Sequence, residues 1–151
     1  MNRDEQGFGS ALVNLTIVVQ RRYGQICADH GLTATQAQLL CMLKDGPRGM
    51  TELARLLGLA KPGLSGLVDR IEKLGMVTRE TSEQDRRAIT LNVTPRGKEA
   101  ADALYADVGA HLPDTILTDL APADREHLER IVRGIVAAHA VGCEGPPVAD
   151  R

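Results

Sequence analysis

The hydrophobic pattern changes in the middle of the chain, from the helical period of about 3.6 residues to the strand period of about 2. From Lys61 to Leu74 the apolar residues form one helical stripe, which Gly75 ends. Val77–Thr81 and Ile89–Val93 then read as two strands, joined by a polar hairpin loop. The chain must therefore place a helix directly before a β-hairpin.

A second short helix precedes this unit. Thr51 is a suitable N-cap for it, and Gly58 closes it after about two turns. Two short helices joined by Gly58-Leu59-Ala60 match a helix-turn-helix, and the hairpin that follows is then a wing. We therefore predict a mainly α fold with a small β-hairpin wing, in which a winged helix-turn-helix spans Thr51 to Thr94.

Long amphipathic helices are expected on both sides of this lobe. One runs from Phe8 to about Asp29, and Thr35 is the expected N-cap of the next. Thr94-Pro95 begins a fifth helix, which Pro113 breaks or kinks, and Pro122 opens the last one.

The apolar stripes of these terminal helices are too long for the small lobe to cover. Pairing with a second copy would bury them, so we expect a homodimer. The predicted organisation has disordered ends at 1–7 and 142–151, a helical dimerisation region at 8–34 and 95–141, and the winged helix-turn-helix lobe at 35–94.

Charge is distributed unevenly along the chain. The formal net charge is −2, but residues 61–98 carry 8 Lys/Arg and 5 Asp/Glu, whereas residues 99–151 carry 4 and 10. The sums are +3 for the middle segment and −6 for the last one. This pattern favours one face that meets an anion, with the rest of the surface solvated.

Several classes of protein fit the sequence poorly. We find no phosphate-binding glycine loop and no nucleophile motif, so we expect neither an enzyme nor a cofactor. The histidines lack metal-ligand spacing, and the three cysteines suggest reduced thiols. The longest apolar stretch, Ala11 to Val19, is too short to span a bilayer, so we expect a cytoplasmic protein without a membrane partner.

The sequence resembles the MarR family of bacterial transcriptional regulators over about Phe8 to His139. The most specific match is the wing signature, an Asp and an Arg two residues apart followed by Leu-Thr, present here as Asp85, Arg87, Val93 and Thr94, with valine replacing leucine. The segment from Leu67 to Val77 and the run Thr94-Pro95-Arg96-Gly97 support it.

This resemblance implies a homodimer with interlocking terminal helices that binds a pseudo-palindromic operator in double-stranded DNA. The helix that begins at Lys61 would enter the major groove, and the wing would reach the adjacent minor groove. The resemblance further implies a repressor that a small aromatic or anionic effector releases from DNA.

The expected DNA contacts on the reading helix lie off its apolar stripe: Lys61, Pro62, Gly63, Ser65, Gly66 and Arg70. Lys61 and Ser65 suit phosphates or base edges, and Arg70 suits phosphate or guanine. Glycine inside a helix costs about 1 kcal/mol relative to alanine, so Gly63 and Gly66 need a reason. Close approach to DNA is one reason, and tight packing against the preceding helix is the other.

This helix also departs from the usual family pattern. Family members often have a Ser or Thr where this chain has Ala60, and larger polar residues around Gly66.

In the wing, Arg86 is the first candidate for the minor groove, where an arginine senses the enhanced negative potential. Arg87 is either a second DNA contact or the partner of Asp85 or Asp69. Asp85, Asp69 and Thr94 are the residues expected to shape the wing.

The effector site is less well defined by the sequence. Arg22 lies on the apolar seam of the first helix, where a charge is costly unless it is paired. It would bind an anionic effector, or else pair with Asp29 or with a carboxylate of the partner chain. Arg21, Tyr23 and His30 are the neighbouring candidates.

Two alternatives remain open. A redox-responsive regulator would use Cys27 or Cys41, which requires an accessible thiolate with a lowered pKa. Peroxide sensors of this family carry their cysteine near the start of the first helix, where this chain has none. The other alternative is a winged helix that binds a protein instead of DNA.

Overall fold

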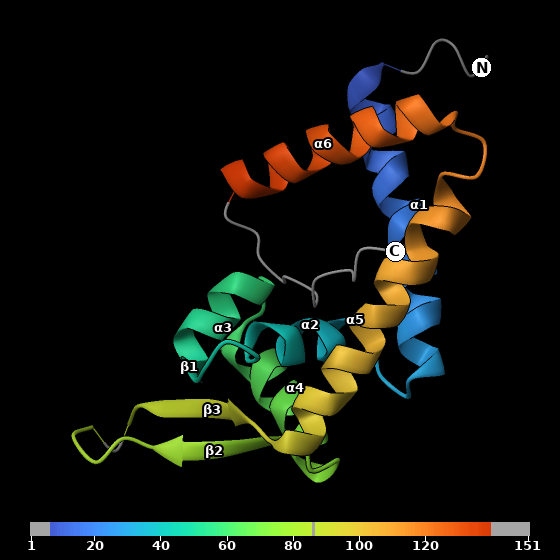
Figure 1. Cartoon of the computed structure of the whole chain (residues 1–151). Helices are drawn as coiled ribbons and strands as arrows, with labels where there is room; N and C mark the ends of the chain where they lie inside the picture. Colours follow the sequence, from blue (N-terminus) through green and yellow to red (C-terminus); the bar gives the residue numbers. More distant parts are fainter. Residues whose placement is uncertain (1–6, 86, 140–151) are drawn as a thin grey trace.

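The computed structural model describes residues 7–85 and 87–139. These residues form six helices and three strands, in the order α1 (Phe8–Asp29), α2 (Ala34–Met42), β1 (Arg48–Gly49), α3 (Met50–Leu57), α4 (Lys61–Lys73), β2 (Val77–Thr81), β3 (Ile89–Val93), α5 (Pro95–Ile116) and α6 (Pro122–Ala138). The mainly helical fold with a small wing is thus confirmed. Figure 1 shows the lobe of α2, α3, α4 and the sheet at one end, and α6 at the other.

The sheet has one strand more than the sequence predicted. Strands β2 and β3 form the predicted antiparallel hairpin, with Val77 opposite Val93. Strand β1 pairs with the other edge of β3, with Arg48 opposite Leu91, so the strand order is β1-β3-β2. Two residues are too few to produce a recognisable alternation, so the sequence pattern does not reveal this strand.

Three helix boundaries differ from their expected places. Thr33, not Thr35, caps α2: its Oγ1 accepts the Gln36 N–H at 3.2 Å, while Gln36 Oε1 accepts the Thr33 N–H at 3.0 Å. Residue Gly49, not Thr51, precedes α3. Of the two expectations for Pro113, a break of α5 is wrong, because the helix continues to Ile116.

The lobe has a single hydrophobic core. Its fully buried large side chains come from α2 and its C-cap, α3, α4, β3 and α5: Leu39, Leu40, Leu43, Leu53, Leu64, Ile71, Leu91 and Leu104. Cys27 near the end of α1 packs into the same cluster. The core therefore attaches the lobe to the inner halves of the two long helices.

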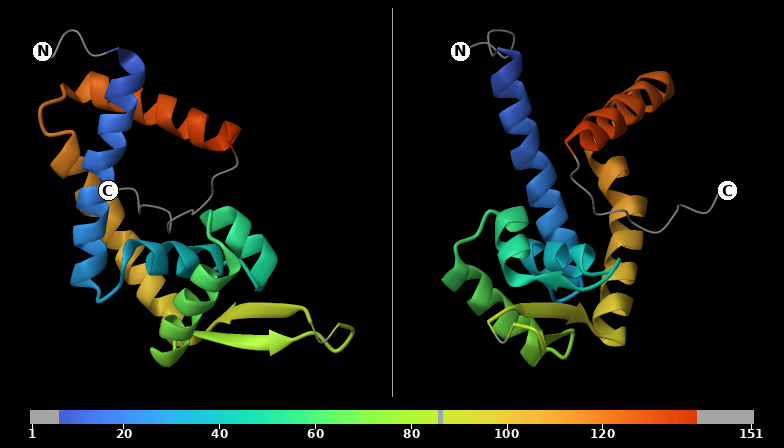
Figure 2. Two further views of the ribbon diagram at one scale, coloured as in Figure 1. Left: turned by 180° about the vertical axis from the view of Figure 1, so that it is seen from behind. Right: turned by 90° about the vertical axis from the view of Figure 1, so that its left-hand side faces the viewer.

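The outer halves of the long helices have apolar faces without a cover. On α1, Phe8 is 79% exposed, and on α6, Ile135 is 55% exposed. No residue of α6 is buried. Figure 2 shows the start of α1 and the whole of α6 projecting away from the lobe.

No helix in the described part of the chain combines the length and the apolar character that a membrane crossing requires. The predicted disordered ends, 1–7 and 142–151, fall outside the described residues except for Gly7.

Candidate nucleic-acid interface

The turn between α3 and α4 is held by the backbone. Gly58 adopts a left-handed conformation, with φ of 64°, and the Leu59 N–H donates to the Ala54 carbonyl at 2.9 Å. Ala60, the N-cap of α4, provides no side-chain hydrogen bond to the first turn. The start of α4 therefore keeps backbone N–H groups that no capping side chain occupies.

Helix α4 separates its buried and outer faces cleanly. Leu64, Leu67, Val68 and Ile71 are buried. Of the six residues predicted to contact DNA on this helix, Gly66 is half-buried and the others are exposed. The structure thus brings Lys61, Ser65 and Arg70 to the outside of the lobe, on the helix that follows the turn.

The two glycines of α4 are not explained by packing against α3. A Cβ atom added at Gly63 would meet no atom within 4 Å. At Gly66 it would meet only Nη2 of Arg70, at 3.7 Å, and Arg70 Nε donates to the Gly66 carbonyl at 3.1 Å. The packing explanation is therefore wrong. The surface of α4 simply lacks a side chain at these two positions.

Asp85 organises the tip of the wing. Its Oδ1 accepts the backbone N–H of Arg87 at 3.0 Å, and its carbonyl accepts the Ala88 N–H at 3.0 Å. The expected link between Asp85 and Arg87 thus runs through the backbone of Arg87. Arg86, the predicted minor-groove residue, lies outside the described residues.

Asp69 has a different partner from the one considered. Arg79 on β2 donates to Asp69 Oδ1 at 2.6 Å and to Glu72 Oε1 at 2.9 Å. The hydrogen bond that Arg79 donates to Asp69 is the main cause that raises the pKa of the Arg79 guanidinium above its usual value. An Asp69–Arg87 pair is therefore not the link between helix and wing.

Sequence reasoning missed Arg79, although a signal was present. Arg79 is paired with the buried Leu91 on the neighbouring strand, so the two side chains share one face of the sheet. A charged residue on a face that also carries core residues predicts a nearby partner of opposite charge.

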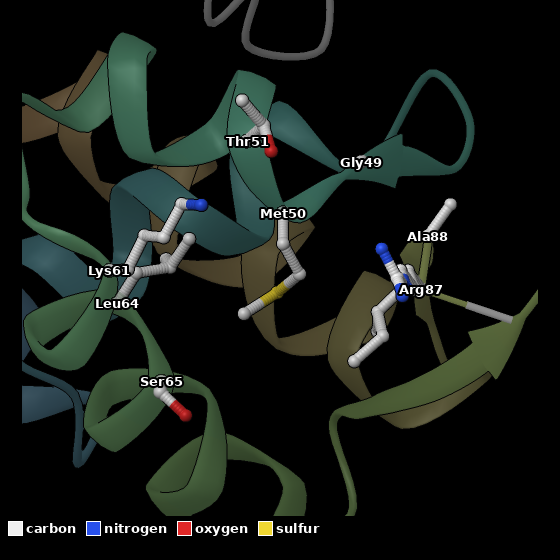
Figure 3. Close-up of a pocket in the computed structure, with 9 residues that line it drawn as sticks. Gly49, Met50, Thr51, Lys61, Leu64, Ser65, Arg87 and Ala88 are labelled. Carbon is white, nitrogen blue, oxygen red and sulfur yellow. The ribbon is translucent and has the colours of Figure 1, made fainter.

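A cavity of about 350 Å³ lies between the helices and the loop end of the wing. Lys61, Leu64 and Ser65 line one side, and Arg87 and Ala88 lie across from them, with Met50 between (Figure 3). Ile89 adds to the apolar lining. The cavity thus combines apolar walls with two cationic side chains on opposite sides.

The effector candidates on α1 have partners that the sequence did not indicate. Tyr23 Oη lies 2.9 Å from Tyr105 Oη, and His30 Nε2 lies 2.8 Å from Asp107 Oδ2, so both face α5. Arg22 Nη1 donates to Gln25 Oε1 at 3.3 Å.

The considered ion pair between Arg22 and Asp29 is therefore replaced by a contact with a neutral amide. Arg22 Nε is buried without a hydrogen-bond partner among the described residues. Arg21 is exposed.

The described cysteines are poorly placed for redox sensing. Cys27 and Cys41 are both buried. Burial raises the pKa of the Cys27 thiol, and a hydrogen bond with Tyr23 acts in the opposite direction. A redox sensor needs an exposed thiolate with a lowered pKa, so Cys27 has the opposite properties.

Comparison with known proteins shows a match to one family over part of the chain. The MarR family model matches residues 30–88, from the end of α1 to the hairpin loop of the wing. An HTH-type transcriptional regulator of Bacillus subtilis, YfiV, is 32% identical over 75 residues, which cover 49% of this chain and 47% of that protein. The match thus spans about half the length of this curated relative.

Solved structures match over most of the chain. Wild-type MarR from E. coli in its apo form is 20% identical, with a TM-score of 0.81 over 87% of this chain and 97% of that one. The transcriptional repressor CouR, bound to a 23-mer DNA duplex, is 27% identical, with a TM-score of 0.73 over 86% and 92% of the two chains.

The family and the fold are those of transcriptional regulators, not of enzymes. The family match covers the helix-turn-helix and most of the wing, and the structural likeness extends through the terminal helices. Residues 30–88 thus match the MarR family, and the chain has the winged helix-turn-helix fold of the solved MarR structure.

Proposed function

We propose that this chain is a transcriptional regulator that binds double-stranded DNA as a homodimer and represses transcription from a pseudo-palindromic operator. One observation carries the proposal: the outer face of α4 presents Lys61, Ser65 and Arg70 beside a wing that is joined to the same helix. The structural relative CouR, solved on a DNA duplex, supports a DNA partner for this arrangement. The proposed site of action is the cytoplasm.

In this proposal α4 enters the major groove. Its first turn carries Lys61 and lacks a capping side chain, so it can accept a phosphate at its N-terminus. Gly63 and Gly66 leave room for the helix to approach the groove wall closely. Arg70 then reaches base edges or phosphates from the last turn of the helix.

The wing contacts the adjacent minor groove. Arg86 is the proposed minor-groove residue, on the grounds of its sequence position at the hairpin tip. If Arg86→Ala bound the operator as tightly as the wild type at moderate salt, this assignment would be wrong.

The homodimer is proposed from the uncovered apolar faces. Exposed large apolar residues gather on the outer half of α1 and on one face of α6, which include Phe8, Leu12, Leu15, Ile131 and Ile135. A second copy would bury these faces, and its twofold symmetry would place two α4 helices at half-sites about one turn of DNA apart.

Release by a small effector is proposed at the cavity between Lys61 and Arg87. Its apolar walls and two cations suit a small aromatic acid, and an occupant there would lie on the surface proposed to meet DNA. The candidates predicted on α1, Arg21, Arg22, Tyr23 and His30, form the alternative site. Benzoate is a suitable probe: release of DNA by benzoate should be lost in Arg87→Met and kept in Arg22→Met, and the reverse pattern would favour α1.

A titration of labelled DNA tests the proposed function. The protein is added to fragments of its own promoter region and to random DNA of equal length, each at two salt concentrations. We expect tighter binding to the promoter fragment and a strong loss of affinity at the higher salt. Absent or salt-insensitive binding would instead favour a winged helix that binds protein.

A further inference from the structure

Arg79 joins the wing to the helix proposed to read DNA. Its two terminal nitrogens contact different residues: Nη2 lies 2.6 Å from Asp69 Oδ1 and Nη1 lies 2.9 Å from Glu72 Oε1. The two carboxylates are three residues apart, so they are neighbours on the surface of α4. One guanidinium therefore holds two points of the helix from one point of β2.

The chemistry of this contact requires arginine. A guanidinium is a planar fork that can donate to two carboxylates in fixed directions, whereas the ammonium of lysine is a point charge on a flexible stem. The Arg79 side chain is only 27% exposed, compared with 54% for Asp69 and 40% for Glu72. Isolated surface ion pairs contribute little, but a network with a partly buried centre holds geometry better.

The contact also changes the charge of the reading helix. Asp69 and Glu72 place two negative charges on α4, which would repel the phosphates of DNA in the proposed complex. Arg79 neutralises one of these charges. Its own positive charge is already paired with carboxylates of the protein. Its geometry is thus that of an internal link and not of a free cation.

We infer that Arg79 is a positioning residue, which sets the angle between α4 and the wing and hence the spacing between major-groove and minor-groove contacts. This inference rests on the proposed function for its consequence in DNA binding. The rival role for Arg79 is a direct contact with a phosphate.

The first test needs no DNA. Amide hydrogen exchange of β2 and β3 is compared in the wild type, Arg79→Met and Arg79→Lys. We expect exchange in the wing to rise about threefold to tenfold in Arg79→Met and by less in Arg79→Lys. The matched control is Arg133→Met, which removes an ion pair to Glu129 within α6 and should leave the wing unchanged. Wild-type exchange in the wing of Arg79→Met would overturn the inference.

The second test uses a mutant cycle on the promoter fragment. Arg79→Met should weaken binding about threefold to tenfold in the wild-type background, and should have almost no further effect once Asp69→Ala and Glu72→Ala have removed its partners. The slope of log K against log salt should not fall by the amount expected for one lost phosphate contact. An equal loss in both backgrounds, with a slope smaller by about 0.9, would identify a direct phosphate contact instead.

The two tests distinguish a failure of the proposed DNA binding from a failure of the role inferred for Arg79. If the wild type failed to bind DNA, the proposed function would fall, while the exchange experiment would still decide whether Arg79 fixes the wing.

Discussion

Thr94 Oγ1 donates a hydrogen bond of 2.7 Å to the Gly75 carbonyl, which joins the residue before α5 to the turn after α4. The same oxygen accepts the Gly97 N–H at 3.1 Å and so caps α5. The Thr94 N–H in turn donates to the Met76 carbonyl at 2.9 Å. The end of the reading helix and the start of a long helix are therefore held as one unit.

This junction leaves no room at Gly97. A Cβ atom there would lie 2.1 Å from the Met76 carbonyl oxygen and 2.9 Å from a methyl carbon of Val93. We expect Gly97→Ala to lower the free energy of unfolding by about 3 kcal/mol, because a backbone atom must move to relieve the overlap. Urea unfolding measures this loss. The matched control is Gly109→Ala on the same helix, where an added Cβ meets nothing within 4 Å and should not destabilise the protein.

Gly63 has the opposite character. An alanine there fits the free protein, so Gly63→Ala should raise the free energy of unfolding by about 0.5–1 kcal/mol through helix propensity. If α4 approaches DNA closely, the same methyl group should weaken binding to the promoter fragment. Gly109→Ala, which should stabilise similarly, should leave DNA affinity unchanged. Equal affinity of Gly63→Ala and wild type would show that DNA does not approach this residue.

The apolar face of α6 gives a test of the homodimer. Ile135→Asp should raise the dissociation constant of the dimer at least about tenfold, because the symmetric interface would bury two unpaired carboxylates in place of two isoleucines. Ala137→Asp places the same charge on the opposite, exposed face of α6 and is the control. Sedimentation equilibrium measures both. A dimer unaffected by Ile135→Asp would mean that this face is not the interface.

Burial of Cys27 predicts a dependence of stability on pH. Its folded pKa is raised above that of the unfolded thiol, which is about 8.5. The folded state therefore holds the proton more tightly, and the resulting stability is present at neutral pH and lost as pH rises above this value. Unfolding free energies at pH 7 and pH 10 should differ less in Cys27→Ala than in the wild type. An equal decline in both proteins would exclude Cys27 as its source.

Most of the fold followed from patterns with a clear period. The boundaries of α1, β2 and β3 agree with their predicted ranges, because long stripes and strict alternation leave little choice of register. Helix caps were harder: Thr33 and Thr35 are both competent, and only the reciprocal bond with Gln36 selects Thr33.

The sequence could predict those site residues whose position depends only on which face of a helix is exposed. Lys61, Ser65 and Arg70 could be placed on the outside of α4 because its apolar stripe defines the other side. The partners of Arg79 and the cavity could not be predicted, since both depend on how the wing folds back beside α4. Contacts between separate elements are set by tertiary packing.

The most direct test of the central claim is the salt dependence of DNA binding by the wild type and Lys61→Gln, measured on one promoter fragment. Lys61 is exposed at the first turn of α4 and was proposed to meet a phosphate. We expect weaker binding and a slope of log K against log salt that is smaller by about 0.9, as for one lost phosphate contact. The same affinity and the same slope in both proteins would contradict the placement of α4 on DNA.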